Sequence, residues 1–531
     1  MATPPTDLER LIESLAQPGV LPGSEGGPVE IAQTHISVVF LTRDRAFKLK
    51  KPVDFGFLDF STPELRAHFC REELRLNRRL APDAYLGLCP VHRLADGRIE
   101  VGEPAASPPP ADELLVAMVR LPADRMLDRM LAEGTVVPRH IERIARVMAS
   151  FHDRVDAGPE VSRFGTREAV GRLALENFDQ TVPFVGDLFD EPRHGAMRRR
   201  TGMFLETRER LFARRVEEAR IRDGHGDLHS PNICIVGDDP VIYDCIEFSP
   251  AYRAVDVASE IGFLAMDLEY RGRPDLARLL VDAYVRESED EPMRAMLPFY
   301  IAYRAMVRAK ISALTAAAPE IDDAVRERAR RAGASFFDLA HRWSEGLVPP
   351  ALVMVAGPLG AGRRRLAAVL AERAGLRPID GADLRASIVG VSREEVDRAA
   401  DDALFSESVT RATCRALARN ARRRLEHGET ALVVDFLFRE EHRSLVAEAA
   451  RATGVPVVLV TIEASDERLA TALRAAGIER PAAAYEAQRR AADRPGAFAG
   501  PGVHVPLEAG PDVEAQAAEV LRRCRELAGS P

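Results

Sequence analysis

The chain has 531 residues, of which 46% are hydrophobic and 29% are charged, and its formal net charge is −9. This length exceeds what one hydrophobic core supports, so two or three domains are expected. The acidic balance argues against a protein that binds nucleic acid through bulk positive charge.

The N-terminal region predicts one helix followed by a hairpin. Residues 7–17 carry apolar side chains at helical spacing. Residues 36–41 and 46–49 are short strand-like runs, and the polar residues 42–45 between them predict a turn.

A second helix is predicted over residues 63–80. Ser61 or Thr62 can act as its N-cap, and Pro63 suits the first helical position. Residues 114–121 then form an apolar, strand-like run.

Helical patterns dominate after this strand, in three stretches: 139–155, 199–220, and from Asp244 to about 345 with a break near 271–274. Strands before about residue 121 and helices after it predict a small sheet-rich lobe and a larger helical lobe.

Residues 225–232, His-Gly-Asp-Leu-His-Ser-Pro-Asn, are the most informative stretch of the chain. Asp227 precedes Asn232 by five residues, and Asp244 follows seventeen residues after Asp227, at the end of the apolar run 241–243. Phosphoryl transfer to a hydroxyl needs one carboxylate for the acceptor. It also needs an amide oxygen and a second carboxylate for the Mg²⁺ that neutralises the phosphates. A plain turn capped by an aspartate would not require this three-part spacing.

This motif resembles the aminoglycoside phosphotransferase-like branch of the protein-kinase fold, which also contains choline, fructosamine and maltose kinases. The resemblance implies that Asp227 is the catalytic base, and that Asn232 and Asp244 bind Mg²⁺ beside ATP. It also implies that His225 is a structural member of the loop and that Asp256 braces the loop from downstream.

In this family a lysine on an internal strand grips the phosphates, and a helix carboxylate holds that lysine. Lys48 matches the family pattern of two apolar residues, Lys and a further apolar residue. Lys50 shares its strand face, so both stay candidates, with Lys48 preferred. On the helix, Glu73 matches the family register best and Glu72 is second.

The strand at 115–121 would be the hinge, with backbone groups around 118–121 bonding the adenine edge. Met118 and Arg120 are therefore predicted nucleotide contacts, although Met118 would equally suit the core. The phosphate acceptor is not readable, because variable helices build its pocket in this fold.

Longer stretches resemble a bacterial group of two-domain proteins, in which an aminoglycoside phosphotransferase-like domain is fused to a P-loop kinase-like domain. The likeness rests on residues 34–37, 48–60 and 73–80 and extends over essentially the whole chain. It implies an α+β bilobal protein-kinase-like domain followed by an α/β P-loop domain. The predicted boundaries are 1–345 for the first domain (small lobe about 30–121, large lobe about 122–345), 346–350 for a linker, and 351–531 for the P-loop NTPase-like domain.

The residues after the linker support a parallel sheet. The linker itself, residues 346–350, reads Gly-Leu-Val-Pro-Pro. Buried strand-like runs follow at 351–356, 431–434 and 456–462, with helical segments between them. This alternation is typical of βαβ units around a parallel sheet.

Residues 357–364, Gly-Pro-Leu-Gly-Ala-Gly-Arg-Arg, occupy the place of the P-loop sequence G-x-x-x-x-G-K-[ST]. The Lys and Ser/Thr of that sequence are replaced by Arg363 and Arg364, and arginine cannot ligate Mg²⁺. Three glycines still fit a loop whose amides surround a phosphate: Gly357, Gly360 and Gly362. We expect weakened phosphoryl transfer here. The alternatives are an anion-binding or nucleotide-sensing module that needs no Mg²⁺, and a turn without a ligand.

Two further acidic residues belong to the P-loop resemblance. Asp383, with Arg385, lies where kinases of the gluconate-kinase type contact their substrate. Asp435, at the end of the run 432–434, holds the usual acidic position of the second strand.

These features predict an ATP- and Mg²⁺-dependent phosphotransferase that acts on a hydroxyl of a small-molecule substrate through its N-terminal domain. The C-terminal domain would be weakened or regulatory. The alternative is a non-catalytic regulatory protein that binds nucleotides. A protein kinase fits less well, because no Ala-Pro-Glu and no long activation segment follow Asp244.

The six cysteines, all outside Cys-x-x-Cys pairs, predict neither a zinc site nor a disulfide framework. No apolar run reaches the roughly 18 residues that span a bilayer. Residues 1–10 also lack the order of a signal peptide. We therefore expect a cytoplasmic protein with neither membrane nor nucleic-acid partners. Its oligomeric state is left open.

Overall fold

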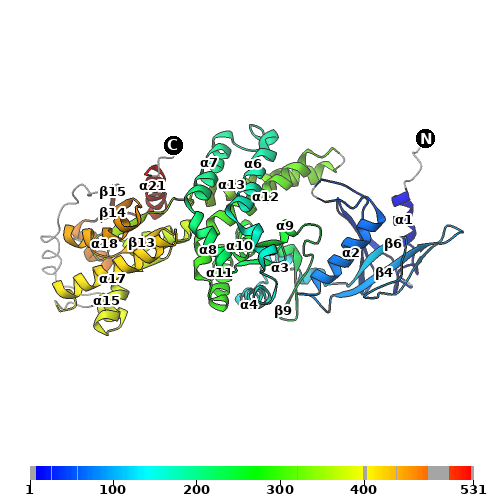
Figure 1. Cartoon of the computed structure of the whole chain (residues 1–531), viewed down its shortest axis with the longest axis horizontal. Coiled ribbons are helices and arrows are strands. Elements are labelled where there is room, and N and C mark those ends of the chain that lie inside the picture. The colour runs from blue at the N-terminus through cyan, green and yellow to red at the C-terminus, as the bar shows by residue number, and fades with distance from the viewer. Residues whose placement is uncertain are drawn as a thin grey trace. The chain divides into compact units, whose positions relative to one another are not determined.

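A computed structural model describes residues 7–25, 27–56, 58–319, 321–398, 403–437, 439–475 and 502–527 (Figure 1). The chain divides into two compact units. The first consists of Met1–Gly165 and Ala219–Glu291, and the second of Thr166–Glu218 and Pro292–Pro531. Both units are discontinuous in sequence, so this division differs from the predicted boundary at 346–350.

The first unit begins with an antiparallel sheet of six strands in the order β1-β2-β3-β6-β4-β5. The predicted hairpin is confirmed as β2–β3, whereas β4 and β5 were not predicted. The strands are β1 (Glu30–Gln33), β2 (Ser37–Leu41), β3 (Arg45–Lys50), β4 (Tyr85–Arg93), β5 (Ile99–Val101) and β6 (Glu113–Val119).

Each face of this sheet packs against one helix, because side chains alternate between the faces. Leu115 and Ala117 of β6 join the core beneath α1 (Asp7–Leu15). Leu114 and Val116 join the core beneath α2 (Pro63–Asn77), which lies beside β4 and β6 (Figure 1).

Helix α2 begins as predicted and ends three residues early. Thr62, rather than Ser61, is its N-cap, and the Thr62 side chain accepts a hydrogen bond from the Leu65 amide. The chain then turns at residues 78–80 instead of continuing the helix.

The rest of the first unit is mainly helical and is organised around α10 (Val257–Tyr270). Every residue of α10 from Val257 to Leu268 is buried, as expected for a helix at the centre of a core. Helix α11 (Pro274–Ser288) packs against α10 and against α4 (Pro138–Arg154). The other elements are α3 (Leu127–Ala132) and the two-stranded pairs β7 (Ile221–Asp223)–β10 (Ala254–Asp256) and β8 (Ile233–Val236)–β9 (Asp239–Ile242). A small sheet lobe with α2, followed by a helical lobe, is the predicted protein-kinase-like architecture.

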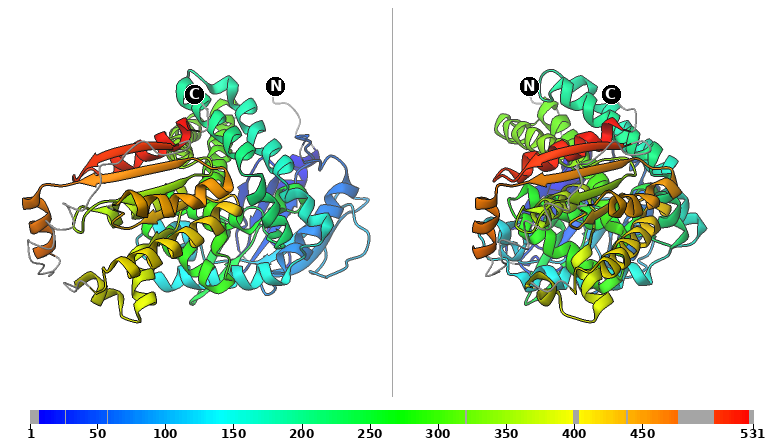
Figure 2. Two further views of the ribbon diagram at one scale, coloured as in Figure 1. Left: turned by 60° about the vertical axis from the view of Figure 1, so that its left-hand side comes forward. Right: turned by 90° about the vertical axis from the view of Figure 1, so that its left-hand side faces the viewer.

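The second unit contains a parallel five-stranded sheet in the order β12-β13-β11-β14-β15. The predicted strands β11 and β13 are fully buried, and the predicted strand β14 is mostly buried, whereas β12 and β15 were not predicted. Figure 2 shows β14 in orange beside β15 in red. The strands are β11 (Leu352–Ala356), β12 (Pro378–Asp380), β13 (Ala431–Val434), β14 (Val457–Glu463) and β15 (Gly502–Glu508), and the longer helices are α14 (Arg363–Ala374), α17 (Glu407–Glu426), α18 (Glu440–Thr453) and α21 (Val513–Glu526).

The second unit also holds five helices from the region before residue 345: α6 (Arg167–Thr181), α7 (Glu191–Thr207), α8 (Glu209–Glu217), α12 (Leu297–Ala317) and α13 (Asp323–Ser344). The helical pattern predicted over 199–220 is confirmed for 199–207 and 209–217, but two helices share it because the helix breaks at Arg208. That side chain is buried and donates hydrogen bonds to the Val348 carbonyl (2.7 Å) and to Thr430 Oγ1 (2.9 Å). These distant contacts outweigh the local helical pattern.

Short elements complete the described structure: α5 (Pro159–Ser162), α9 (Pro250–Arg253), α15 (Gly381–Val389), α16 (Arg393–Arg398), α19 (Asp466–Ala475), and the 3₁₀ turns η1 (Ala123–Arg125), η2 (Arg163–Gly165), η3 (Val182–Phe184), η4 (Ser230–Asn232) and η5 (Glu291–Ala295).

The segment predicted as a linker is buried. Leu347 and Val348 are at most 1% exposed, and a Cβ on Gly346 would lie 1.8 Å from the Arg373 carbonyl oxygen. The segment therefore packs closely inside the second unit, and a domain boundary at 346–350 stays a prediction.

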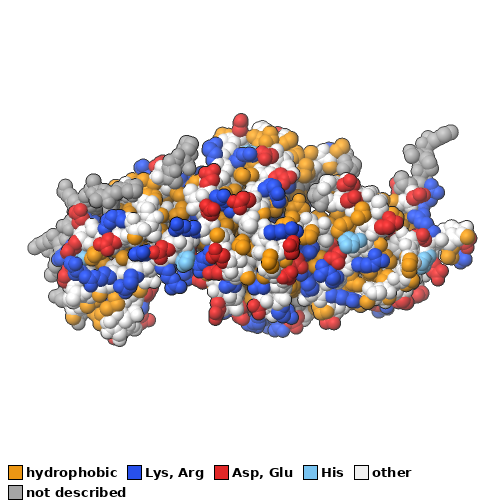
Figure 3. Space-filling view, in the orientation of Figure 1, with side chains coloured by type: hydrophobic (Ala, Val, Ile, Leu, Met, Phe, Trp, Pro, Cys, Tyr) orange, Lys and Arg blue, Asp and Glu red, His pale blue; other side chains and the backbone are white. Residues whose placement is uncertain are grey.

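The surface carries both signs of charge. Figure 3 shows acidic and basic side chains interspersed over the face in view. Among the described residues, no helix combines the length and the apolar character needed to cross a bilayer.

Candidate active site

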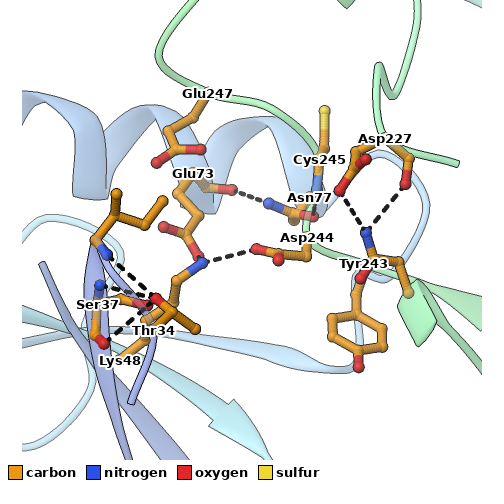
Figure 4. Close-up of polar contacts among 12 residues, drawn as sticks. Thr34, Ser37, Lys48, Glu73, Asn77, Asp227, Tyr243, Asp244, Cys245 and Glu247 are labelled. Atoms are coloured by element: carbon orange, nitrogen blue, oxygen red, sulfur yellow. Dashed lines mark hydrogen bonds and ion pairs between the residues drawn. The ribbon is translucent and has the colours of Figure 1, made fainter. Parts of the chain in front are cut away.

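The candidate site in the first unit begins with Lys48, which β3 points toward α2. Lys48 Nζ donates hydrogen bonds to Glu73 Oε1 (2.9 Å) and Asp244 Oδ1 (2.7 Å). Figure 4 shows the Lys48 amino group between these two carboxylates. The fold therefore brings together three of the residues predicted for phosphate and metal binding.

Lys50 forms a second layer behind Lys48. Its Nζ donates to Glu73 Oε2 at 2.6 Å and also to the Glu247 carboxylate. The Lys50 side chain is 1% exposed, against 12% for Lys48, and its amino group lies 4.7 Å from the centroid of the Phe60 ring. Lys48 is thus the lysine that also contacts Asp244, whereas Lys50 is enclosed.

The ionisation of this cluster follows from its burial and its charge pairs. Burial alone would lower the pKa of Lys48, but Asp244 and Glu73 outweigh it and raise that pKa well above its usual value. Burial would raise the pKa of Glu73, but Lys48 and Lys50 outweigh it and lower that pKa. For Glu247, burial prevails and raises the pKa. Lys48 is therefore held in its charged form, which suits a phosphate ligand.

The loop that carries Asp227 is a tight turn. Gly226 has a φ of +86°, and a Cβ there would lie 2.8 Å from the Tyr252 carbonyl oxygen, so glycine is required. Asp227 Oδ2 accepts hydrogen bonds from Asn232 Nδ2 (3.0 Å) and from the His229 ring (3.2 Å). With its side chain 34% exposed, Asp227 can still be reached by a substrate.

Hydrogen bonds on both sides fix the ring of His225. Its Nδ1 accepts a hydrogen bond from the Asp227 amide (3.2 Å), so its Nε2 is the donor to the Tyr243 carbonyl (2.9 Å). Burial lowers the pKa of His225, which keeps the ring neutral in this arrangement. The histidine thus links the loop of Asp227 to the strand that leads to Asp244.

The resemblance implies that Asp256 braces this loop, and that role stays a prediction. Helix α10 also reaches the loop through Glu260, whose Oε1 accepts hydrogen bonds from the amides of His225 (2.8 Å) and Gly226 (2.5 Å). Asp256 caps α10, since its Oδ1 accepts from the Ala258 amide at 2.9 Å. Glu260, which was not predicted as a site residue, lies in the first turn of α10, four residues after the cap.

Glu260 is itself held by His152 of α4. The His152 Nε2 lies 2.7 Å from Glu260 Oε2, and its Nδ1 lies 2.8 Å from the Tyr284 hydroxyl. Burial alone would raise the pKa of Glu260, but the hydrogen bond and charge of His152, with the loop amides, lower it to about 2. A carboxylate buried at this place therefore stays ionised and fixes the loop.

Asn232 and Asp244 fit a divalent cation. Asn232 donates through Nδ2 to the Asp227 carbonyl and carboxylate, both at 3.0 Å, which leaves Oδ1 as the oxygen that can bind a metal. The Asp244 side chain is 44% exposed, and its backbone is left-handed with a φ of +63°. Carboxylate and amide oxygens are the ligands that Mg²⁺ prefers.

The predicted hinge residues lie at the end of β6. Met118 is partly buried and packs against the core beneath α2. The amides of Val119 and Arg120 donate to the carbonyls of Ala84 (2.8 Å) and Asp44 (2.9 Å). Adenine binding by this segment stays a prediction, and within the described residues the Leu121 amide makes no backbone hydrogen bond.

The second unit forms the predicted glycine-rich loop between β11 and α14. A Cβ at Gly357 would lie 2.8 Å from the Ile462 carbonyl oxygen, and Gly360 and Gly362 have φ values of +86° and +96°. The Arg363 guanidinium lies 4.2 Å from the centroid of the Phe436 ring. The backbone thus has the glycine conformations of a phosphate loop.

Arg364, at the position where a P-loop has Ser or Thr, is held in ion pairs. Its Nε lies 3.0 Å from Asp380 and its Nη2 lies 2.7 Å from Asp397. Arg393 pairs with Asp380 (2.6 Å), Asp397 (3.3 Å) and the exposed Asp383. The carboxylates of Asp380, Asp383 and Asp397, which lie near the loop, are therefore all paired with arginines.

Asp435 lies at the end of β13, as predicted, and is 4% exposed. Arg385 Nη2 lies 3.8 Å from Asp435 Oδ2. A small cavity lies beside this aspartate and is lined by Leu359, Arg363, Arg364, Asp380, Ala382, Val396, Asp397, Val434, Asp435 and Phe436.

Comparison with known proteins gives matches for both halves of the chain. Residues 352–495 match the family model described as an AAA domain. An uncharacterized protein of Mycobacterium tuberculosis (strain ATCC 25618 / H37Rv) is 32% identical over 414 residues, which cover 76% of this chain and 78% of the relative. The chain belongs to the family of this mycobacterial protein. A protein of Mycobacterium bovis matches with the same identity and coverage.

Solved structures also resemble parts of the chain. A choline/ethanolamine kinase family protein from Mesorhizobium loti has a TM-score of 0.36 at 13% identity and covers 63% of this chain and 99% of its own. Aminoglycoside 2′-phosphotransferase-IIIa has a TM-score of 0.38 at 12% identity, with 62% and 98% covered. A gluconokinase from Sinorhizobium meliloti has a TM-score of 0.27 at 17% identity, with 34% and 96% covered.

Proposed function

We propose that the protein is an ATP- and Mg²⁺-dependent phosphotransferase of the cytoplasm that phosphorylates a hydroxyl of a small molecule through its first unit. The observation that carries this proposal is the contact of Lys48 with both Glu73 and Asp244. A strand lysine, a helix carboxylate and a loop carboxylate meet at one point, beside the loop of Asp227.

Each residue has a distinct task in this proposal. Lys48, oriented by Glu73, would contact the phosphates, and Asn232 Oδ1 with Asp244 would hold Mg²⁺. The metal would supply charge neutralisation for the phosphates. Asp227 would accept a hydrogen bond from the acceptor hydroxyl and take its proton, while the hydroxyl oxygen bonds the γ-phosphorus of ATP and the bond from that phosphorus to the bridging oxygen of ADP breaks.

For the second unit we propose weakened phosphoryl transfer and a regulatory role. Arg364 offers no hydroxyl for Mg²⁺, and its guanidinium already pairs with Asp380 and Asp397. The same contacts favour the second candidate function, in which the whole protein is a non-catalytic regulator that binds nucleotides.

A metabolite screen with ATP and Mg²⁺ tests the main proposal. We expect turnover by the wild type and its loss in Asp227→Ala and Asp244→Ala, with Asp96→Ala as a control for an exposed aspartate in a turn of the same unit. Turnover that survives Asp244→Ala would contradict the proposal. If calorimetry gave the same ATP affinity with and without Mg²⁺, and the screen found no turnover, the non-catalytic regulator would be favoured instead.

A further inference from the structure

Five consecutive residues around Asp244 are each held by a different partner. Their anchors are Tyr243 N to Asn232 O (3.0 Å), Asp244 N to Tyr85 Oη (3.3 Å), Cys245 N to Asn77 Oδ1 (2.9 Å), Ile246 N to His225 O (3.0 Å), and the Glu247 carboxylate to Lys50 Nζ. We name residues 243–247 the aspartate arm. Its partners come from the catalytic loop, β4, α2 and β3.

Asp244 lies at the strained point of this arm. A φ of +63° is uncommon for a residue with a side chain, and such strain persists only where the surroundings impose it. The amides on both sides are fixed, since Asp244 N bonds Tyr85 and Cys245 N bonds Asn77. The arm is therefore set in place before any ligand arrives.

The anchor at the end of the arm is a buried ion pair. Lys50 and Glu247 are 2% and 8% exposed, and Lys50 also donates to Glu73. A buried ion pair contributes less stability than well-packed apolar side chains of similar volume would, because both charges lose their hydration. Stabilisation of the fold therefore does not by itself explain why the Lys50–Glu247 ion pair is buried beside Asp244.

We propose that Lys50 and Glu247 are positioning residues, whose ion pair holds the aspartate arm against β3 and so presets the Asp244 carboxylate for its metal ion. The inference rests on the proposed function, in that Asp244 is taken as a metal ligand. The pair acts through Asp244 and touches neither nucleotide nor acceptor. Glu73 connects the two layers, since one oxygen orients Lys48 and the other holds Lys50.

The test replaces both charges at once in the full-length chain. Lys50→Met/Glu247→Met removes the pair without leaving one charge buried alone, so the fold should survive. Mn²⁺ affinity in the presence of ADP is measured by electron paramagnetic resonance, and amide hydrogen exchange of residues 244–246 is measured without ligand. We expect Mn²⁺ affinity to fall by about tenfold or more, as for other residues that orient metal ligands, and the three amides to exchange faster.

The control pair is Arg66→Met/Glu113→Met. Arg66, which is buried, and Glu113, whose side chain is 13% exposed, form an ion pair between α2 and the start of β6 in the same lobe. None of the five anchors of the arm involves either residue. This control should keep wild-type Mn²⁺ affinity and wild-type exchange at 244–246.

Two results separate failure of the inference from failure of the proposed function. Wild-type Mn²⁺ affinity and exchange in Lys50→Met/Glu247→Met, alongside lost binding in Asp244→Asn, overturn the positioning role alone. Unchanged Mn²⁺ binding in Asp244→Asn overturns the metal role of Asp244, and the proposed function and the inference fall together.

Discussion

Lys48 on β3 donates a hydrogen bond of 2.7 Å to Asp244, which lies 196 residues further along the chain. The same amino group is 2.9 Å from Glu73 on α2. Two carboxylates hold this cation, and its side chain remains 12% exposed, so we expect it to exchange one carboxylate for a phosphate when a nucleotide binds. The sequence preferred Lys48 over Lys50, and the geometry distinguishes the two lysines by their contacts.

The two lysines should respond differently to loss of charge. Lys48→Met should mainly weaken ATP binding, because the side chain contacts the site. Lys50→Met should cost about 3–5 kcal/mol of unfolding free energy, because it leaves Glu247 buried without its cation. Calorimetry with ATP and urea unfolding measure the two effects. Lys51→Met, at a more exposed lysine bonded to the Thr34 carbonyl, is the control. If Lys50→Met kept the wild-type unfolding free energy but bound ATP poorly, Lys50 rather than Lys48 would be the lysine that contacts the phosphates.

Substitutions of Asp227 and Asp244 should impair different steps, phosphoryl transfer for Asp227 and metal binding for Asp244. Asp227→Asn should keep Mg²⁺-dependent ADP binding and lower kcat by about 10²–10⁴-fold, the usual contribution of a general base. Asp244→Asn should lose the Mg²⁺ dependence of ADP binding. Calorimetry with and without Mg²⁺, beside steady-state kinetics, separates them. Equal loss of nucleotide affinity in both variants would argue against a base at Asp227.

Glu260 should stabilise the first unit in a pH-dependent way. Its pKa falls from 4.5 to about 2 in the folded protein, so its contribution is complete above pH 4.5 and is lost as the pH falls toward 2. The shift corresponds to about 3 kcal/mol. The difference in unfolding free energy between wild type and Glu260→Gln should shrink over this range. A difference that stays constant with pH would show that the charge of Glu260 contributes nothing.

Restoring the two altered P-loop positions should create Mg²⁺-dependent nucleotide binding in the second unit. In an Asp244→Asn background, Arg363→Lys/Arg364→Ser would return the lysine that reaches the phosphates and the hydroxyl that ligates Mg²⁺. Calorimetry with ATP should then detect binding that needs Mg²⁺, whereas Arg365→Ser, at the next position of α14, should not produce it. If the Asp244→Asn variant already bound ATP in an Mg²⁺-dependent way with Arg363 and Arg364 in place, these arginines would not impair the loop.

Local sequence patterns determined much of the fold. Alternating and helical spacing located β2, β3, β6, β11 and β13, because those signals depend only on neighbouring residues. Short or weakly apolar strands, such as β5 and β12, gave no such signal. The 199–220 pattern failed at Arg208, where hydrogen bonds to the distant residues Val348 and Thr430 end one helix and begin the next.

The sequence by itself determined which residue types were available for phosphoryl transfer and in what order: Lys48, Glu73, Asp227, Asn232 and Asp244. Only the tertiary structure decided which of them touch. Strand alternation gives Lys48 and Lys50 the same face, and the positions of Asp244 and Glu247 distinguish them. Glu260 meets the amides of His225 and Gly226 from a position one helical turn beyond Asp256, and one turn moves a carboxylate by about 5.4 Å along the axis. Such distances depend on how remote segments pack, and the order of residues along the chain does not record them.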